Sequence, residues 1–271
     1  MSRRLESAVL HGVLIAGGVV TLFPLFWMLS ASFMSSGEAA TFPPHLVPHA
    51  ATLDQYRQLF VRLNLGRAFF SSAVVAIIVT ISSVLFGSMA GYAFAKLRFG
   101  GRDRLFGLLL SAVVIPPQVG MLPLFLLMKK LHLVNSYWGA IIPSMATMFG
   151  IFLIRQFMLS VPQDLLEAAR LDGAGLWQTW FLVVIPSLRP IIEFVAVVTT
   201  IGVLTSMFGL IYVLTAGGPG TATTLPEFLI WLEQGKMNRP GYAAAISMVL
   251  FVLMGGLAWV QVRIMSRNAD I

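Results

Sequence analysis

Residues 68–95 read AFFSSAVVAIIVTISSVLFGSMAGYAFA, a run without a charged side chain between Arg67 and Lys96. An α-helix rises about 1.5 Å per residue, so a run of this length can cross the roughly 30 Å hydrocarbon core of a bilayer. Inside lipid a segment must satisfy its own backbone hydrogen bonds, and a helix does so. The run therefore predicts a membrane-spanning helix.

Other stretches of the chain have the same character, and none shows the alternating pattern of a transmembrane β-strand. The expected fold class is an all-α membrane protein, with residues 1–271 forming a single transmembrane domain. We expect six transmembrane helices, near residues 9–31, 68–95, 105–128, 136–158, 188–214 and 242–264.

The composition excludes several classes of protein. Of the 271 residues 58% are hydrophobic and 11% are charged, whereas a soluble domain carries about 25% charged residues. The formal net charge is +7, but the basic residues lie in short gaps between apolar runs and form no single nucleic-acid-binding face. Cysteine is absent, which excludes disulfides, a thiol nucleophile and a thiolate metal site.

The distribution of Lys and Arg predicts the orientation. If the N-terminus is inside, eleven of these residues lie on the inner side and seven on the outer side. The short loop Lys96–Arg104 decides the assignment, because cytoplasmic loops carry an excess of positive charge. We therefore expect both termini in the cytoplasm of a bacterial cell, with the chain in its inner membrane.

Two long segments are expected on the outer side. Residues 33–66 include an expected amphipathic helix around Leu53–Leu65, and residues 215–241 have loop sequences at both ends. The glycines of Gly217–Gly220 lack the Lys-Ser/Thr of a phosphate loop, so we expect no ATP site in this chain. The four histidines have no metal-ligand spacing, and no catalytic constellation is present.

The segment 159–187, expected on the inner side, contains a further helix. Ser160 is suited to be an N-cap, Gln163 completes a capping-box spacing, and Gly173 and Gly175 are suited to end a helix. These signals predict a short amphipathic helix at about 162–175.

Two interpretations of this helix follow from the residues. The charges of Glu167, Arg170 and Asp172 can set the register on a partner protein, and the small residues Ala168, Ala169 and Gly173 allow close approach. Alternatively, the helix lies on the lipid headgroups. The residues alone leave both open.

The pattern Glu167-Ala168-Ala169, then Gly173, then Val183-Val-Ile-Pro186 resembles the EAA motif of bacterial ABC importer permeases, with Val183 and Ile185 in place of the family's Ile and Leu. In that family the segment is the coupling helix, which sits in a cleft of the nucleotide-binding subunit. The resemblance implies the type I ABC importer permease fold, and it implies ATPase coupling at Glu167, Ala168, Ala169, Arg170, Asp172 and Gly173.

Resemblance to the carbohydrate-uptake, MalG-like branch extends over nearly the whole chain. It is carried by residues 23–33 (FPLFWMLSASF), 91–100 (GYAFAKLRFG) and 122–126 (LPLFL). One stretch departs from it: residues 212–220 (YVLTAGGPG) are more like the MalF-like partner subunit.

The function implied is that of a permease subunit that imports a sugar, an oligosaccharide or polyol, by alternating access. The implied partners are a second, MalF-like permease, two ATPase subunits that bind the ATP, and a periplasmic or lipid-anchored solute-binding protein. Membrane lipid surrounds the chain, and nucleic acid is not a partner.

Alternatives remain at this point. An ion-gradient-driven secondary transporter would have charged groups deep in several spans, and Glu193 is the one candidate. Arg189 lies one turn before Glu193, so an ion pair between the two is the favoured interpretation. Pro116-Pro117 and Pro143 predict packed kinks, or alternatively carbonyl groups that line a cavity. A membrane-bound enzyme is a third option that lacks catalytic residues.

Overall fold

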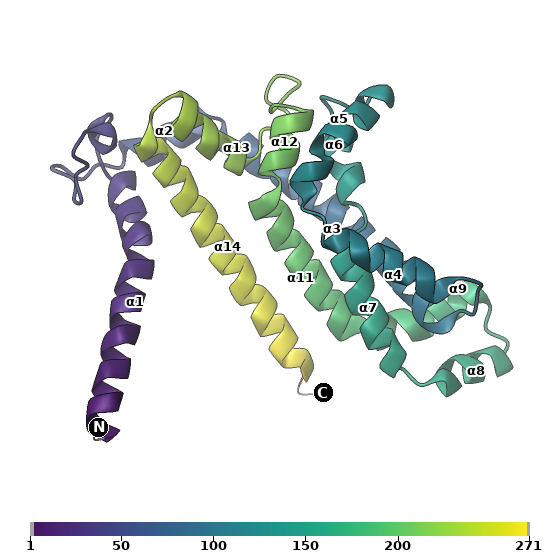
Figure 1. Cartoon of the computed structure of the whole chain (residues 1–271). Coiled ribbons are helices and arrows are strands. Elements are labelled where there is room, and N and C mark those ends of the chain that lie inside the picture. Colours follow the sequence, from purple (N-terminus) through teal and green to yellow (C-terminus); the bar gives the residue numbers. More distant parts are fainter. Residues whose placement is uncertain (1–2, 270–271) are drawn as a thin grey trace. The chain divides into compact units, whose positions relative to one another are not determined.

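The computed structural model describes residues 3–269, and this range is helical without a strand (Figure 1). The longest helices are α1 (Arg3–Ser32), α3 (Leu65–Lys96), α11 (Arg189–Ser206) and α14 (Pro240–Ala269). Five helical stretches in this range are long and apolar enough to cross a membrane, and a bent pair of helices adds a sixth. The expected all-helical fold class is confirmed.

The bent pair replaces the continuous span that we expected at residues 105–128. Helix α4 (Arg102–Val113) ends before the proline pair, η2 (Pro117–Gly120) follows, and α5 (Met121–Lys130) leaves at a bend of 98°. Pro116 is extended, with φ −58° and ψ 131°. A proline removes a helical hydrogen bond, and a following proline disfavours the helical conformation, so two in succession break the helix.

Two other expected spans contain smaller interruptions. Helices α6 (Tyr137–Ile141) and α7 (Met148–Ser160) are joined through η3 (Ile142–Ser144), which contains Pro143. Helix α12 (Phe208–Leu214) follows α11 after the single residue Met207.

The described chain divides into two compact units. The first comprises residues 3–66 and 226–253, and the second comprises 67–225 and 254–269.

The first unit contains α1, η1 (Glu38–Ala40), α2 (Asp54–Val61), α13 (Pro226–Trp231), the π-helical turn η5 (Leu232–Lys236) and the first part of α14. The expected helix around Leu53–Leu65 is present as the shorter α2. The segment 215–241, for which we expected loop sequences at both ends, carries α13 and η5 between those ends.

A small core holds the first unit together. Ala31, Met34, Ala39 and Ala244 are buried against one another. Gln55 of α2 donates a hydrogen bond from Nε2 to the carbonyl oxygen of Met34 at 3.1 Å. The segment after α1 is therefore fixed to α2 and α14.

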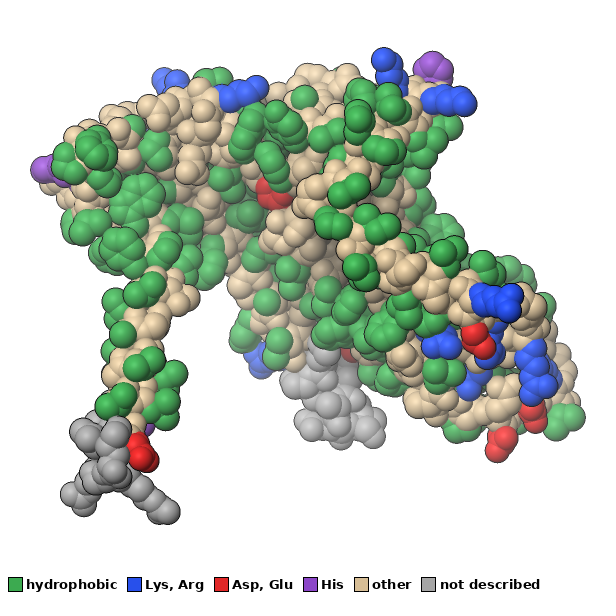
Figure 2. All heavy atoms as spheres, viewed as in Figure 1, with side chains coloured by type: hydrophobic (Ala, Val, Ile, Leu, Met, Phe, Trp, Pro, Cys, Tyr) green, Lys and Arg blue, Asp and Glu red, His purple; other side chains and the backbone are tan. Residues whose placement is uncertain are grey.

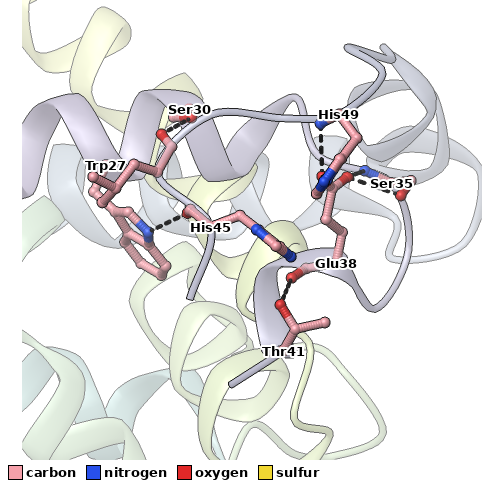
Figure 3. Close-up of polar contacts among 8 residues, drawn as sticks. Trp27, Ser30, Ser35, Glu38, Thr41, His45 and His49 are labelled. Carbon is pink, nitrogen blue, oxygen red and sulfur yellow. Dashed lines mark hydrogen bonds and ion pairs between the residues drawn. The ribbon is translucent and has the colours of Figure 1, made fainter. Parts of the chain in front are cut away.

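The loop after α1 is organised by the carboxylate of Glu38 (Figure 3). Its Oε1 accepts hydrogen bonds from the backbone N–H of His49 at 2.7 Å and lies 2.8 Å from His49 Nδ1. Its Oε2 accepts from the backbone N–H of Ser35 at 3.1 Å and from Ser35 Oγ at 3.0 Å. These bonds, with the His49 backbone contribution the largest, lower the pKa of Glu38 to about 2.

The second unit is built on close packing of α3 against α7. A Cβ atom on Gly91 would lie 2.8 Å from Ile154 Cγ2 and 3.0 Å from the backbone nitrogen of Arg155. A Cβ on Gly87 would lie 3.2 Å from Ile154 Cδ1. Glycine is therefore required at Gly91, where the two helices approach closely through a small residue.

The core of the second unit joins α7 to the helices that follow it. Its buried side chains form one cluster that runs from α7 to α11, and it consists of Ile154, Met158, Val161, Leu166, Trp180, Val184, Leu188 and Val195. Because this cluster includes residues on both sides of the segment 159–187, it positions the candidate site.

Candidate coupling site

The predicted short helix is present as α8 (Gln163–Leu171). Its start differs from the capping box that we expected. Ser160 is the last residue of α7, and its hydroxyl donates to the carbonyl oxygen of Phe157 at 2.7 Å. Pro162 occupies the N-cap position of α8 and provides no side-chain cap. The capping-box prediction is wrong because α7 continues to Ser160.

The end of α8 is fixed by the motif glycine. Gly173 has φ +82°, a left-handed conformation in which other residues are strained. Its N–H bonds to the carbonyl of Arg170 at 3.1 Å, and the N–H of Ala174 bonds to the carbonyl of Ala169 at 2.9 Å. This pair of bonds is a Schellman motif, so Gly173 ends the helix as expected.

One side of α8 is anchored and the rest is open. The side chain of Leu166 is 1% exposed and lies in the core cluster beside Val161, whereas the adjacent Leu165 is 48% exposed. Burying an apolar side chain of this size stabilises by about 1.5–3 kcal/mol. Leu166 is therefore the residue that holds the helix to the second unit.

The motif residues lie on the open part of this segment. Ala169 is half-buried, and the others are exposed: Glu167, Ala168, Arg170, Asp172 and Gly173. Within residues 3–269 none of the three charged ones forms an ion pair. Glu167, Ala168, Ala169 and Arg170 lie on α8, and Asp172 and Gly173 follow at its C-terminal end. The role of these residues in coupling stays a prediction.

Two cations that sequence reasoning used only for orientation fix the surroundings of α8. Lys96, the last residue of α3, donates from Nζ to the carbonyl of Val161 at 2.6 Å. Arg155 of α7 donates from Nε to the carbonyl of Phe94 at 3.3 Å, and its guanidinium lies 4.0 Å from the centre of the Phe106 ring. The end of α3 is thereby tied to the residue that precedes α8. The position of Lys96 at the end of an apolar run is the only sequence signal for this role.

The second half of the motif lies in the connection to α11. After α9 (Leu176–Thr179) the chain forms the π-helical turn η4 (Trp180–Val184) and then α10 (Ile185–Ser187). Pro186 has no N–H to continue an α-helical ladder, and a π-turn before it accommodates the missing bond. Leu188 is fully buried in the same cluster as Leu166, so both ends of the segment join one core.

A cavity of about 310 Å³ lies among α3, η3, α7 and α11 of the second unit. The lining is mainly apolar and includes hydroxyl-bearing residues. Met207, where the chain breaks between α11 and α12, is part of it. The lining residues are Val79, Ser144, Thr147, Phe149, Val198, Thr199, Gly202, Val203, Ser206 and Met207. Interrupted backbone at membrane depth is tolerated where it lines a cavity.

Glu193 forms the ion pair with Arg189 that the sequence spacing favours. Arg189 donates from Nε to Glu193 Oε1 at 2.8 Å, one helical turn away in α11. Among residues 3–269 no group of three or more His, Asp or Glu side chains is placed to hold a metal ion.

The glycine-rich loop after α12 forms a closed turn. A Cβ on Gly218 would lie within contact distance of Asn135 Oδ1. The hydroxyl of Thr223 donates to the carbonyl of Gly218 at 2.6 Å, and the carbonyl of Ala222 accepts from Tyr137 Oη at 2.6 Å. The glycine thus allows a close approach of backbone and side chain.

Comparison with known proteins decides the family. Residues 83–263, about two thirds of the chain, match the family described as binding-protein-dependent transport system inner membrane component. The chain belongs to this family. It is a multi-pass membrane protein, the permease subunit of a binding-protein-dependent transport system, and α8 with its motif lies inside the matched range.

Curated relatives are permeases of the same kind. The arabinooligosaccharides transport system permease protein AraQ of Halalkalibacterium halodurans is 35% identical over 202 residues, covering 72% of each chain. The diacetylchitobiose uptake system permease protein NgcG of Streptomyces coelicolor is 32% identical over 203 residues, covering 74% of this chain and 67% of NgcG. The family resemblance carried by the Glu167–Pro186 motif is thereby confirmed.

A solved structure has the same fold. A chain of a bacterial ABC transporter involved in the import of the acidic polysaccharide alginate matches with a TM-score of 0.78 and 20% identity, covering 96% of this permease and 97% of that chain. A second structure, of the alginate transporter in complex with an alginate-pentasaccharide-bound periplasmic protein, matches with a TM-score of 0.69 and 17% identity over 97% and 94% of the two chains. The ABC importer permease fold is confirmed at this level.

Proposed function

We propose that this permease imports a sugar by ATP-driven alternating access and that α8 is its coupling helix. The observation that carries the proposal is the division of α8 into an anchored and an open side. Leu166 fixes the helix to the core, while the charges of Glu167 and Arg170 are exposed and not paired within the described chain. Such a helix is suited to receive a partner surface and to transmit its movement.

A physical path leads from α8 to the membrane helices. On one side Val161 is bonded to Lys96 at the end of α3, and on the other Leu188 joins the same core at the start of α11. A displacement of Leu166 therefore acts on α3, α7 and α11 together. These helices also line the 310 Å³ cavity, so movement at α8 is expected to change its shape.

The solute that we propose is an oligosaccharide or a polyol. The names of the relatives support this class, since AraQ is named for arabinooligosaccharides and NgcG for diacetylchitobiose. Ser144, Thr199 and Phe149 all line the cavity, and hydroxyl groups together with an aromatic ring suit a sugar, which presents both hydroxyl groups and apolar ring faces. We infer that this cavity is part of the path.

The partners that we propose are a second, MalF-like permease, two ATPase subunits and a solute-binding protein. The alginate transporter was solved with its periplasmic protein, which supports a similar partner here. The ATPase subunits would bind the ATP and contact α8, and we propose that α8 and both chain ends lie on the cytoplasmic side. The ends themselves, residues 1–2 and 270–271, lie outside the described residues.

A test compares Glu167→Ala with Asp54→Ala, which removes an exposed carboxylate from α2 instead. The complex would be reconstituted with its binding protein, and solute-stimulated ATP hydrolysis, uptake and co-purification of the ATPase subunits would be measured. We expect Glu167→Ala to lose stimulation or assembly while the binding protein still binds its sugar, and Asp54→Ala to behave as the native protein.

Two outcomes would contradict the proposal in different ways. Unchanged stimulation and assembly in Glu167→Ala would remove the coupling role of the motif charge. Uptake that needs no ATP and stops when an ionophore collapses the ion gradient would instead favour the secondary transporter. The Arg189–Glu193 ion pair, which occupies the one acidic candidate, is an argument against that alternative.

A further inference from the structure

A second cavity lies beside the coupling segment and shares no lining residue with the 310 Å³ cavity. It has a volume of about 370 Å³ and is formed by the end of α3 with α9 and η4. Its lining is apolar and aromatic, and it consists of Met89, Tyr92, Ala93, Leu97, Leu176, Trp177 and Trp180. Its size is that of a small-molecule site, and its lining suits a hydrocarbon chain.

The aromatic wall of this cavity has the features of a membrane interface. The Trp177 and Trp180 rings lie 6.2 Å apart, edge to face, and Trp180 packs edge to face on Phe181 at 4.7 Å. Tryptophan gathers where hydrocarbon meets the headgroups, because its ring is apolar and its N–H is polar. The Trp180 side chain is 8% exposed, and its Nε1 has no hydrogen-bond acceptor within residues 3–269. A buried indole N–H normally has an acceptor, so one from a bound molecule would complete this site.

A basic recess of about 640 Å³ is lined by residues that directly follow Leu97 in the chain. Leu97 lines the apolar cavity, and the next residue, Arg98, lines the recess together with Arg102 and Arg104. Arg102 is engaged, since it donates to the carbonyl of Leu97 at 3.4 Å and to Asp103 Oδ1 at 3.2 Å. Arg98 and Arg104 are exposed and form no ion pair within the described chain. Figure 2 shows Lys and Arg side chains gathered at this end of the second unit, where Figure 1 draws α8 and α9.

We propose that these two neighbouring recesses form a binding site for one anionic phospholipid. The acyl chain occupies the cavity lined by Trp177 and Trp180, the Trp180 N–H donates to an ester or phosphate oxygen, and the phosphate lies between Arg98 and Arg104. An apolar cavity alone would suit any lipid; the two unpaired guanidinium groups select an anionic headgroup. Because Lys96 ties this end of α3 to Val161, the lipid lies directly beside the connection to α8.

The test uses the full chain in phosphatidylcholine nanodiscs that contain a small fraction of lipid with brominated acyl chains, which quench tryptophan at short range. The probe is brominated phosphatidylglycerol, and brominated phosphatidylcholine is the reference. We expect brominated phosphatidylglycerol to quench more strongly than brominated phosphatidylcholine. The difference in quenching between the two lipids cannot exceed the share of the fluorescence that comes from Trp177 and Trp180, two of the six tryptophans. Trp177→Phe should reduce the excess, whereas Trp259→Phe, at an exposed position of α14, should leave it.

The need for the two arginine charges is tested with the double variant Arg98→Gln/Arg104→Gln. The matched control is the double variant Lys129→Gln/Lys130→Gln, which removes two positive charges from the end of α5. At about one kcal/mol per basic residue near a membrane surface, the arginine pair should weaken the apparent affinity for phosphatidylglycerol by about 30-fold. The lysine pair should leave it unchanged.

Three results would overturn the proposal. Equal quenching by the two brominated lipids would mean that no anionic site is present. An equal loss in the lysine variant would mean that overall surface charge attracts the lipid. Undiminished quenching in the arginine variant, together with loss of a co-purifying ATPase subunit, would assign Arg98 and Arg104 to a protein interface. None of these results depends on solute uptake, so they leave the proposed import function to its own test.

Discussion

Replacing Leu166 by alanine should release α8 from the second unit. Leu166 is 1% exposed and packs in the core with Val161 and Trp180. Truncating a buried leucine to alanine costs about 2–5 kcal/mol, including the cavity that is left. Leu165 precedes it in the same helix and is 48% exposed, so Leu165→Ala should cost about 1 kcal/mol or less. The two variants lose the same atoms and have the same helix propensity, which leaves burial as the difference between them.

The assay is limited trypsin digestion followed by mass spectrometry of the cut after Arg170. This bond lies in the last turn of α8, and a helix must open locally before a protease can cut it. When opening is fast relative to cleavage, the cutting rate follows the population of the open form. A cost of about 3 kcal/mol therefore raises the rate about 100-fold in Leu166→Ala. Equal rates in the two variants would refute the assignment of Leu166 as the anchor, and cutting at Arg104 serves as an internal reference.

Three further predictions concern packing, the helix end and pH. Gly91→Ala should lower the unfolding temperature in differential scanning fluorimetry, because its Cβ would meet α7 backbone at 3.0 Å and overpacking costs about 1–3 kcal/mol; Gly107→Ala, with open space around it, should not. Gly173→Ala, at φ +82°, should destabilise the end of α8 by about 1–2 kcal/mol and speed hydrogen exchange there, whereas Gly175→Ala, at φ −68°, should be nearly neutral. The pKa of Glu38 is lowered from 4.5 to about 2, so its contribution to stability is complete above pH 4.5 and is lost as the pH falls toward 2. The native protein should therefore lose more thermal stability than Glu38→Gln across that interval. Equal losses would contradict the stabilising role of the Glu38 carboxylate.

The sequence was sufficient for features that depend on one segment at a time. The length of the apolar run at 68–95 predicts α3, and the glycine at 173 predicts the end of α8, because each follows from local backbone chemistry. The spacing of Arg189 and Glu193 likewise predicts their ion pair. In each case the groups that determine the feature lie within the same helix or turn.

Features that depend on tertiary packing could not be predicted in this way. The pair Pro116-Pro117 predicts an interruption of the span from local chemistry, but the 98° bend at which α5 leaves depends on packing against other helices. Ser160 has an N-cap sequence, yet α7 extends through it. Leu165 and Leu166 are chemically identical, and only the position of Trp180 and its neighbours decides which of them is buried.

The separation of Leu166 from the exposed motif residues has a consequence for the evolution of the transport system. The core that positions α8 and the surface that a partner would contact share no charged side chain. Under the proposed coupling role, substitutions at Glu167 or Arg170 would change the surface offered to an ATPase subunit without disturbing the core of the permease. Under the same proposal, duplicated transport systems could diverge in partner choice through this exposed surface while the core around Leu166 stays the same.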